Sequence, residues 1–256
     1  MIPKVIHYCW FGHNPIPKEY YSYMQSWQEK CPDYKIQRWD ESNFDVAQNL
    51  YCKQAYARKK WAFVSDYARL KIIYEHGGIY LDTDVEVVKD LSPLIASGNG
   101  FIGFQNSEEA NTGLGFAAEA KNPCIKAMLD IYEKRKFILD DGSLNLTPCP
   151  AANTVGLMKV GLRIGKNSSK LLQYLDGLTV YPEEYFNPVN SDTKKLNLTA
   201  NTYTIHWYSA SWFDQSAKKK QFLKKLIPNF ILSYRSNRIA RNDIDKIRRE
   251  VSYKEP

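Results

Sequence analysis

The chain has 256 residues, of which 44% are hydrophobic and 25% are charged, and its formal net charge is +7. This composition is ordinary for a folded globular protein and excludes a disordered or fibrous chain. No stretch approaches the roughly 18 apolar residues of a membrane-spanning helix, and the N-terminus lacks a basic segment before a long apolar run, so we expect a chain that is neither secreted nor membrane-spanning.

The five cysteines, an odd number, show no closely spaced pair of the metal-binding type. We therefore interpret them as free thiols of a protein that stays in a reducing cytosol.

The first half of the chain alternates apolar strand-like runs with segments of helical periodicity. The predicted elements, in chain order, are a strand over 4–10, a helix over 16–30, a strand over 34–39, one or two short helices over 41–54, and a long buried helix over 55–76 that Gly77-Gly78 ends. Strand, helix and strand at this spacing indicate parallel strands joined by a helical crossover. The sequence thus predicts an α/β fold.

The second half contains shorter elements between polar and Pro-rich loops. We predict a strand or strand pair over 79–88, a strand over 101–104, a polar loop over 106–112, a strand over 114–118, a helix over 122–136, a loop over 140–153, a helix over 154–159, and strands over 179–181, 185–186 and 202–208.

The positive charge is concentrated near the C-terminus. Residues 217–249 contain eleven Lys or Arg against two Asp, a local charge of +9, whereas residues 1–216 sum to −1. We predict a main domain over 1–216 and a basic, amphipathic, helical extension over 217–256. Three roles remain open for this extension: a solvated helical face, contact with an anionic membrane through Phe222, Leu226, Phe230 and Ile231, and nucleic-acid binding, for which no reading motif is present.

The most informative segment is Asp82-Thr83-Asp84, which follows a helix, a Gly-Gly stop and a short apolar strand. In an extended segment alternate side chains share a face, so these two carboxylates can converge on one hard cation, and such a cation can hold a diphosphate. An isolated Asp-x-Asp is commonly a solvated turn, but a position behind a strand of an α/β sheet is where sites usually lie. Asp66 and Arg69 share a face of the preceding helix, either as a simple ion pair or facing a ligand.

Three segments of the chain, residues 2–12, 62–84 and 206–212, together resemble the DXD-containing sugar transferases of glycosyltransferase family 32, of the type that synthesises capsular polysaccharide. These enzymes are related to the glucosylating domains of large bacterial toxins. The resemblance implies a GT-A type, Rossmann-like nucleotide-binding fold with a mixed central sheet. It also implies a bound Mn²⁺ or Mg²⁺ and a nucleotide-sugar donor, a UDP-sugar before a GDP-sugar, whose sugar is transferred with retention.

The resemblance also implies roles for the residues that contact the donor. Trp10 resembles the aromatic residue that stacks on the donor base, although a core Trp at a strand end is the alternative. Asp66 and Arg69 resemble the pair that holds the sugar and ribose hydroxyls and the phosphate. Ser211 and Trp212 resemble the hydroxyl and indole donors that bind the diphosphate.

The implied metal ligands come from two of these segments. Asp84 resembles the direct ligand, and Asp82 contacts ribose or binds the metal through water. His206 is either a further ligand or a satisfied core residue. Asn153 falls where these enzymes have a donor-site loop.

The function that we expect is a retaining glycosyltransferase that moves a hexose or N-acetylhexosamine to a glycan or lipid-linked oligosaccharide in surface polysaccharide synthesis. The acceptor would be carried on a polyprenyl diphosphate at the cytoplasmic, inner face of the membrane, and we expect no nucleic-acid partner. Protein-directed glycosyl transfer, a two-carboxylate phosphohydrolase and a non-catalytic membrane or nucleic-acid binder are the alternatives. The sequence offers no carboxylate to place under the anomeric carbon, so attack from the leaving-group face is our hypothesis.

Overall fold

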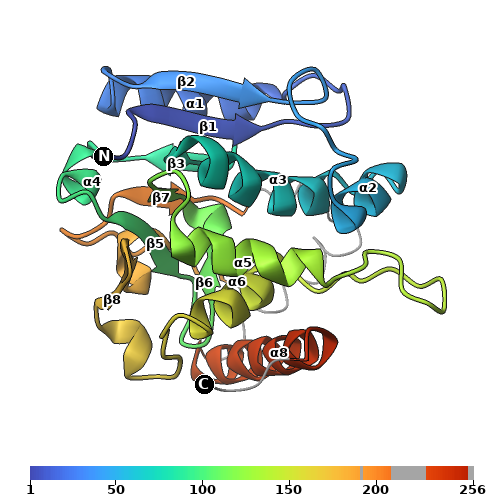
Figure 1. Ribbon diagram of the computed structural model, residues 1–256. Coiled ribbons are helices and arrows are strands. Elements are labelled where there is room, and N and C mark those ends of the chain that lie inside the picture. The colour runs from blue at the N-terminus through green and yellow to red at the C-terminus, as the bar shows by residue number, and fades with distance from the viewer. Residues whose placement is uncertain (191–192, 209–228, 253–256) are drawn as a thin grey trace.

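The computed structural model describes residues 1–190, 193–208 and 229–252 (Figure 1). The strands are β1 (Val5–Cys9), β2 (Lys35–Trp39), β3 (Gly78–Tyr80), β4 (Val85–Val87), β5 (Gly100–Phe104), β6 (Ala110–Asn111), β7 (Phe116–Ala118), β8 (Gln173–Leu175), β9 (Leu178–Tyr181) and β10 (Thr204–His206). The helices are α1 (Lys18–Lys30), α2 (Leu50–Ala57), α3 (Trp61–His76), α4 (Ser92–Ile95), α5 (Pro123–Glu133), α6 (Cys149–Met158) and α8 (Asn229–Glu250), with 3₁₀ turns η1 (Thr112–Leu114), η2 (Ser168–Lys170) and η3 (Glu183–Tyr185).

A central mixed sheet organises the fold, with strand order β2-β1-β3-β7-β5-β9-β8 and β6 paired to β5. β1 runs parallel to both β2 and β3, whereas β3 and β7 are antiparallel. The parallel pairing of β1 with β2 and β3 follows from the helical crossovers that the sequence predicts. The predicted α/β fold with a mixed central sheet is therefore confirmed.

Helices cover both faces of this sheet (Figure 1). One core joins α3, α5 and α6 to the sheet, and the other holds Trp27 of α1 together with Ile6 and Tyr8 of β1. Successive strand residues point to opposite faces, so β1 contributes to both cores. β3 ends at Tyr80, and the polar segment Asp82-Thr83-Asp84 lies just beyond it.

The long helix predicted over 55–76 is two helices. α2 ends at Ala57, and the backbone N–H of Lys60 donates to the carbonyl oxygen of Ala55. Lys59 has a φ of +55°, a left-handed conformation that a continuous helix does not contain. The apolar periodicity continues across this break because both helices bury a face, and periodicity alone does not report a backbone turn.

The structure corrects two further predictions. Residues 185–186 form no strand, because η3 covers Glu183–Tyr185 and the ring of Phe186 stacks on Phe101 with 5.1 Å between centroids. The loop predicted over 140–153 ends early, because α6 begins at Cys149 and Pro150 occupies its first turn, where the missing N–H of proline costs nothing.

The C-terminal helix α8 packs against α6 (Figure 1). Ile244 and Ile247, together with Val251 just beyond the helix, are buried and belong to the same core as α3 and α5. The boundary expected between residues 216 and 217 lies outside the described residues. Among the described residues, no helix is long and apolar enough to cross a membrane.

The packing of α8 can be tested by truncating one buried side chain. Ile247 is fully buried, so Ile247→Ala removes apolar contacts and should lower the free energy of unfolding by about 2–5 kcal/mol. Ile239 lies on the same helix but is 52% exposed, and Ile239→Ala should change stability by less than about 0.5 kcal/mol. Urea denaturation of both variants measures the difference, and equal costs would contradict the packing described here.

Candidate functional site

The predicted acidic pair lies in a turn where the chain leaves the central sheet. β3 belongs to that sheet, whereas β4 pairs with β10 in a separate two-stranded sheet. The backbone N–H of Val85 donates to the carbonyl oxygen of Asp82 at 3.0 Å, which closes the turn. The segment is therefore not extended as predicted, but the two carboxylates still converge, with ligand atoms within 4.8 Å of each other.

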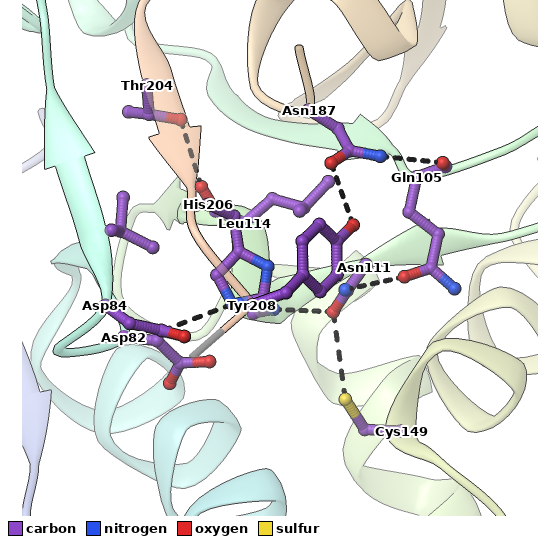
Figure 2. A network of polar contacts seen from close by, with 12 residues as sticks. Asp82, Asp84, Gln105, Asn111, Leu114, Cys149, Asn187, Thr204, His206 and Tyr208 are labelled. Atoms are coloured by element: carbon purple, nitrogen blue, oxygen red, sulfur yellow. Dashed lines mark hydrogen bonds and ion pairs between the residues drawn. The ribbon is translucent and has the colours of Figure 1, made fainter. Parts of the chain in front are cut away.

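Pairing of β4 with β10 brings His206 to the acidic pair. His206 is the register partner of Val85, the residue after Asp84. Its Nε2 lies 3.2 Å from Asp84 Oδ1, and ligand atoms of Asp82, Asp84 and His206 all lie within 4.8 Å of one another (Figure 2). Two carboxylates and an imidazole at this spacing match the ligands of a divalent transition metal.

Arg69 connects the helix α3 to this turn. Its Nη2 lies 3.2 Å from Asp66 Oδ1 and 3.2 Å from Asp82 Oδ1, and its Nη1 donates to Asp82 Oδ2 at 3.2 Å. The Tyr80 hydroxyl donates to Asp82 at 3.0 Å, and the guanidinium lies 5.1 Å from the Tyr80 ring centroid. A forked guanidinium is suited to hold two carboxylates in fixed positions.

The site carries more negative than positive charge. Among the described residues, Asp66 and Asp82 pair with Arg69, whereas Asp84 pairs with His206, and these side chains are largely buried. Burial raises the pKa of Asp66 to about 6 against the opposing effect of Arg69, and burial likewise raises the pKa of Asp82. A buried excess of carboxylate charge favours uptake of a cation.

The His206 imidazole can bind either a proton or a metal ion. Burial lowers its pKa, but the neighbouring charge of Asp84 and their hydrogen bond raise it more, and the net pKa lies above the usual value. Its Nδ1 is buried and has no hydrogen-bond partner among the described residues. The donor set therefore fits a divalent ion, because an imidazole and two carboxylates would exchange shared protons for metal bonds.

The remaining predicted residues lie at different distances from this cluster. Trp10 follows β1, is half-buried, donates from Nε1 to the Asn14 carbonyl oxygen at 2.7 Å and meets the Tyr20 ring edge-on. Ser211 and Trp212 lie outside the described residues. The structure thus brings five predicted residues together and leaves Trp10 at the end of the neighbouring strand.

Asn153 lies within α6 and is fully buried, so it does not belong to a loop as predicted. Its Nδ2 donates to Thr112 Oγ1 at 2.9 Å, and its Oδ1 has no partner among the described residues. Thr112 opens η1, whose Gly113 lies so close to the site that an added Cβ would come within 2.9 Å of Asp82 Oδ2. Asn153 is therefore connected to the acidic cluster through Thr112 and Gly113 of η1.

A polar network behind His206 was missed by the sequence analysis (Figure 2). The ring of Tyr208 lies 4.2 Å from that of His206, and its hydroxyl donates to Asn187 Oδ1 at 2.8 Å. Asn187 in turn donates to the Gln105 carbonyl oxygen at 2.8 Å, and Asn111 Nδ2 donates to Gln105 Oε1 at 2.9 Å. Only the polar character of residues 106–112 hinted at this network, because its members lie far apart in sequence.

Comparison with known proteins identifies the segment that contains the acidic pair. Residues 17–101 match a family model described as a glycosyltransferase sugar-binding region containing a DXD motif. The chain is 33% identical over 116 residues to the uncharacterized glycosyltransferase L373 of Acanthamoeba polyphaga mimivirus, which covers 41% of this chain and 44% of that protein. It is also 33% identical over 102 residues to inositol phosphoceramide mannosyltransferase 3 of Schizosaccharomyces pombe. This match covers 37% of this chain and 27% of that protein.

Among solved structures, the PaToxG glycosyltransferase is similar over 61% of this chain and 69% of its own, with 20% identity and a TM-score of 0.49. The chain spans less than half the length of each of the two curated relatives above. Asp82 and Asp84 lie inside the segment matched by the family model. Over residues 17–101, the chain is therefore similar to the sugar-binding region of DXD-containing glycosyltransferases.

Proposed function

We propose that this chain is a metal-dependent, retaining glycosyltransferase of the GT-A type that takes a hexose or N-acetylhexosamine from a nucleotide-sugar. The observation that carries this proposal is the ion-paired set of Asp66, Arg69 and Asp82, which lies beside Asp84 and His206, the other two side chains of the proposed metal site. The match to a DXD sugar-binding region supports the same reaction class. Within this class we assign the chain to the capsular type of glycosyltransferase family 32. As donors we expect UDP-sugars rather than GDP-sugars.

The ion that we propose is Mn²⁺ or Mg²⁺, held by Asp82, Asp84 and His206. When bound, it supplies positive charge against the diphosphate leaving group. The excess of carboxylates around Arg69 supports this assignment, since a divalent ion would neutralise the excess.

The chain's own residues would act where charge develops. Cleavage of the bond between the sugar and the diphosphate puts negative charge on the leaving oxygen, and Arg69 supplies fixed positive charge beside it. Asp66 is held by Arg69 and offers carboxylate oxygens to sugar hydroxyls. For Ser211 and Trp212 we propose hydrogen bonds to the diphosphate, and for Trp10 a contact with the donor base.

Two further parts of the proposal concern positioning and stereochemistry. Asn153 supports the donor site through Thr112, since its hydrogen bond holds η1 close to Asp82. For retention, we propose that the acceptor attacks from the leaving-group face with the departing phosphate as base. Trapping of a covalent glycosyl-enzyme adduct would contradict this mechanism.

The acceptor that we propose is a glycan or an oligosaccharide on a polyprenyl diphosphate, met at the inner face of the membrane during surface polysaccharide synthesis. Support comes from the outer face of α8, where Ile231, Tyr234 and Ile239 are exposed beside Arg235 and Arg238. Exposed apolar side chains among basic ones suit an anionic interface. Phe222 and Leu226, expected to share this role, lie outside the described residues.

Metal binding can be measured without any sugar. Mn²⁺ should bind the metal-free protein, and Asp84→Asn should weaken the affinity roughly 10–100-fold because a ligand charge is lost. Asp33→Asn, at a carboxylate whose side chain is 79% exposed, should leave it unchanged. His206 cannot ligate while protonated, so affinity should be full above its raised pKa and fall as the pH drops through it. Calorimetric titration at several pH values tests both statements.

Donor turnover tests the reaction class. The protein should hydrolyse one member of a panel of UDP- and GDP-sugars slowly without an acceptor, and only with Mn²⁺ or Mg²⁺. Asp84→Ala should lower this rate at least ~100-fold, since the leaving-group charge is then uncompensated. Asp33→Asn is the matched control. Phosphate release from simple phosphate esters instead, or salt-sensitive DNA retention with no sugar-nucleotide turnover, would contradict the assignment.

Sedimentation with lipid vesicles tests the membrane contact. The protein should bind vesicles containing phosphatidylglycerol and remain free with phosphatidylcholine alone. A basic residue near an anionic surface contributes about 1 kcal/mol, so Arg235→Glu with Arg238→Glu should weaken binding at least ~10-fold. Reversal of an exposed charge elsewhere, Lys4→Glu, should have little effect. Equal binding by the wild type and the double variant would exclude this face of α8.

A further inference from the structure

Gln105, the residue after β5, has all four of its polar groups in hydrogen bonds. Its backbone N–H donates to the Glu109 carbonyl oxygen at 2.8 Å, and its Nε2 donates to Glu109 Oε2 at 2.8 Å. Its Oε1 accepts from Asn111 Nδ2 at 2.9 Å, and its carbonyl oxygen accepts from Asn187 Nδ2 at 2.8 Å. Gln105 therefore joins the loop between β5 and β6, residues 105–109, to two side chains on other elements.

The first of these side chains leads to Asp82 through η1. Asn111 Oδ1 accepts a hydrogen bond from the Gly113 N–H at 2.7 Å, which caps the start of η1. A Cβ added at Gly113 would lie 2.9 Å from Asp82 Oδ2 and 3.2 Å from Arg69 Nη1, so η1 packs directly against both side chains. A shift of η1 would therefore change the space in which the Asp82 carboxylate is held.

The second side chain, Asn187, leads to His206. Asn187 Oδ1 accepts from the Tyr208 hydroxyl at 2.8 Å, and the Tyr208 ring meets the His206 ring edge-on with 4.2 Å between centroids. The two connections meet again, because Thr204 Oγ1 of β10 donates to the Leu114 carbonyl oxygen of η1 at 3.2 Å. The contacts form a closed chain along one side of the proposed metal site (Figure 2).

A buried carboxylate lies at the origin of these contacts. Glu109 is 6% exposed, and its Oε2 accepts from Asn106 Nδ2 at 2.9 Å as well as from Gln105. Arg241 pairs with the neighbouring Glu108 at 2.8 Å, and no ion pair joins Glu109 to another described residue. A buried carboxylate without a cation is costly, so its presence at this position calls for a functional reason.

The reason that we see is direction. An ionised carboxylate only accepts hydrogen bonds, whereas a carboxamide both donates and accepts and can fit in either of two orientations. Because Glu109 accepts, the Gln105 amide must present Nε2 to it and Oε1 to Asn111. Asn111 must then present Nδ2 to Gln105 and Oδ1 to the Gly113 N–H. One buried acceptor thus fixes the orientation of both amides up to the start of η1.

We propose that Gln105 and Glu109 are positioning residues for the metal site. Glu109 orients the Gln105 amide. Gln105 then keeps η1 beside Asp82, and it also keeps the Tyr208 ring beside His206. The inference rests on the proposed function in one respect, the binding of a divalent ion by the acidic pair and His206. It assigns control of the ligand geometry to a loop outside residues 17–101, the segment that matches the sugar-binding family model.

Mn²⁺ binding to the metal-free full chain tests this role without any sugar. Gln105→Leu removes the amide without adding a charge, and it should weaken the Mn²⁺ affinity roughly 10-fold, as loss of residues behind metal ligands does. The matched control is Gln25→Leu, because Gln25 Nε2 also donates to a glutamate, Glu29, at 2.8 Å but on an exposed part of α1. It should bind Mn²⁺ as the wild type does. Calorimetric titration well below the melting temperature of each variant measures the affinities.

Two variants of Glu109 separate positioning from general destabilisation. Glu109→Gln keeps an oxygen that accepts from Gln105 and should stay within about 3-fold of the wild-type affinity. Glu109→Leu removes the acceptor and should weaken the Mn²⁺ affinity roughly 10-fold, although it relieves the cost of a buried carboxylate. If Glu109 acts through Gln105, adding Glu109→Leu to Gln105→Leu should cost little more than Gln105→Leu alone. A merely structural role would make the affinity follow the melting temperature instead.

A crystal structure of Gln105→Leu gives a readout that needs neither metal nor activity. We expect Gly113 to move away from the Asp82 carboxylate. We also expect the contact of His206 Nε2 with Asp84 Oδ1, now 3.2 Å, to change when the Tyr208 ring loses its support.

The outcomes distinguish the two proposals. A wild type that binds no Mn²⁺ would overturn the proposed function, and the crystal structure would still decide whether Gln105 positions Asp82 and His206. Wild-type affinity in both leucine variants, equal losses in Glu109→Gln and Glu109→Leu, or an unchanged site in the crystal structure would overturn the positioning role alone. If Gln105→Leu fails to fold, the affinity and crystal structure of Glu109→Leu decide the question.

Discussion

The double contact of Arg69 with Asp66 and Asp82 is the interaction on which the site depends. It joins α3 to the turn after β3, two elements that would otherwise bring buried carboxylates together without compensation. Loss of the guanidinium would leave these carboxylates unpaired in the interior, where they would take up protons rather than keep their charge. One side chain therefore sets both the geometry and the charge of the acidic cluster.

Hydrogen bonds and two glycines also fix the backbone where α3 leads into β3. Trp39 Nε1 donates to His7 Nδ1 at 2.9 Å, so the proton of this imidazole is on Nε2, which donates to the Gly77 carbonyl oxygen at 3.0 Å. Burial lowers the pKa of His7 to about 4, which keeps the ring neutral in this arrangement. Gly77 has a φ of +67°, and at Gly78 an added Cβ would lie 2.8 Å from the Val5 carbonyl oxygen. Glycine is therefore required where the helix turns into the strand.

The site is assembled where two sheets meet, and this explains why its parts are scattered along the chain. β3 delivers the acidic pair from the central sheet, and β10 delivers His206 through its pairing with β4. η1 borders the acidic cluster, with Gly113 next to Asp82. Behind these elements, α8 packs into the same core as α3. A basic helix that charge alone would assign to the surface thus has a buried side, and Glu250 in its last turn contacts the buried Arg135.

Local patterns in the amino-acid sequence were enough to predict most of the elements and to identify the acidic pair. Helical and alternating apolar patterns predicted β1, α1, β2 and the parallel pairing, because those patterns follow from the period of the backbone. The order of a helix, two glycines and a strand before Asp82 indicated the place of a site, since strand ends in α/β sheets carry sites. Asp66 and Arg69 were identified for a different reason, because residues three apart are neighbours on one helical face.

The way in which distant segments come together follows from the fold and not from local patterns. The break at Lys59, the helical position of Asn153 and the network of Asn187 with Gln105 depend on packing between segments far apart in sequence, to which local periodicity is blind. The same holds for Arg135 and Glu250, which are 115 residues apart and meet only because α8 folds back onto α6. A residue's type states what chemistry it can perform, but its burial and its partners come from the fold.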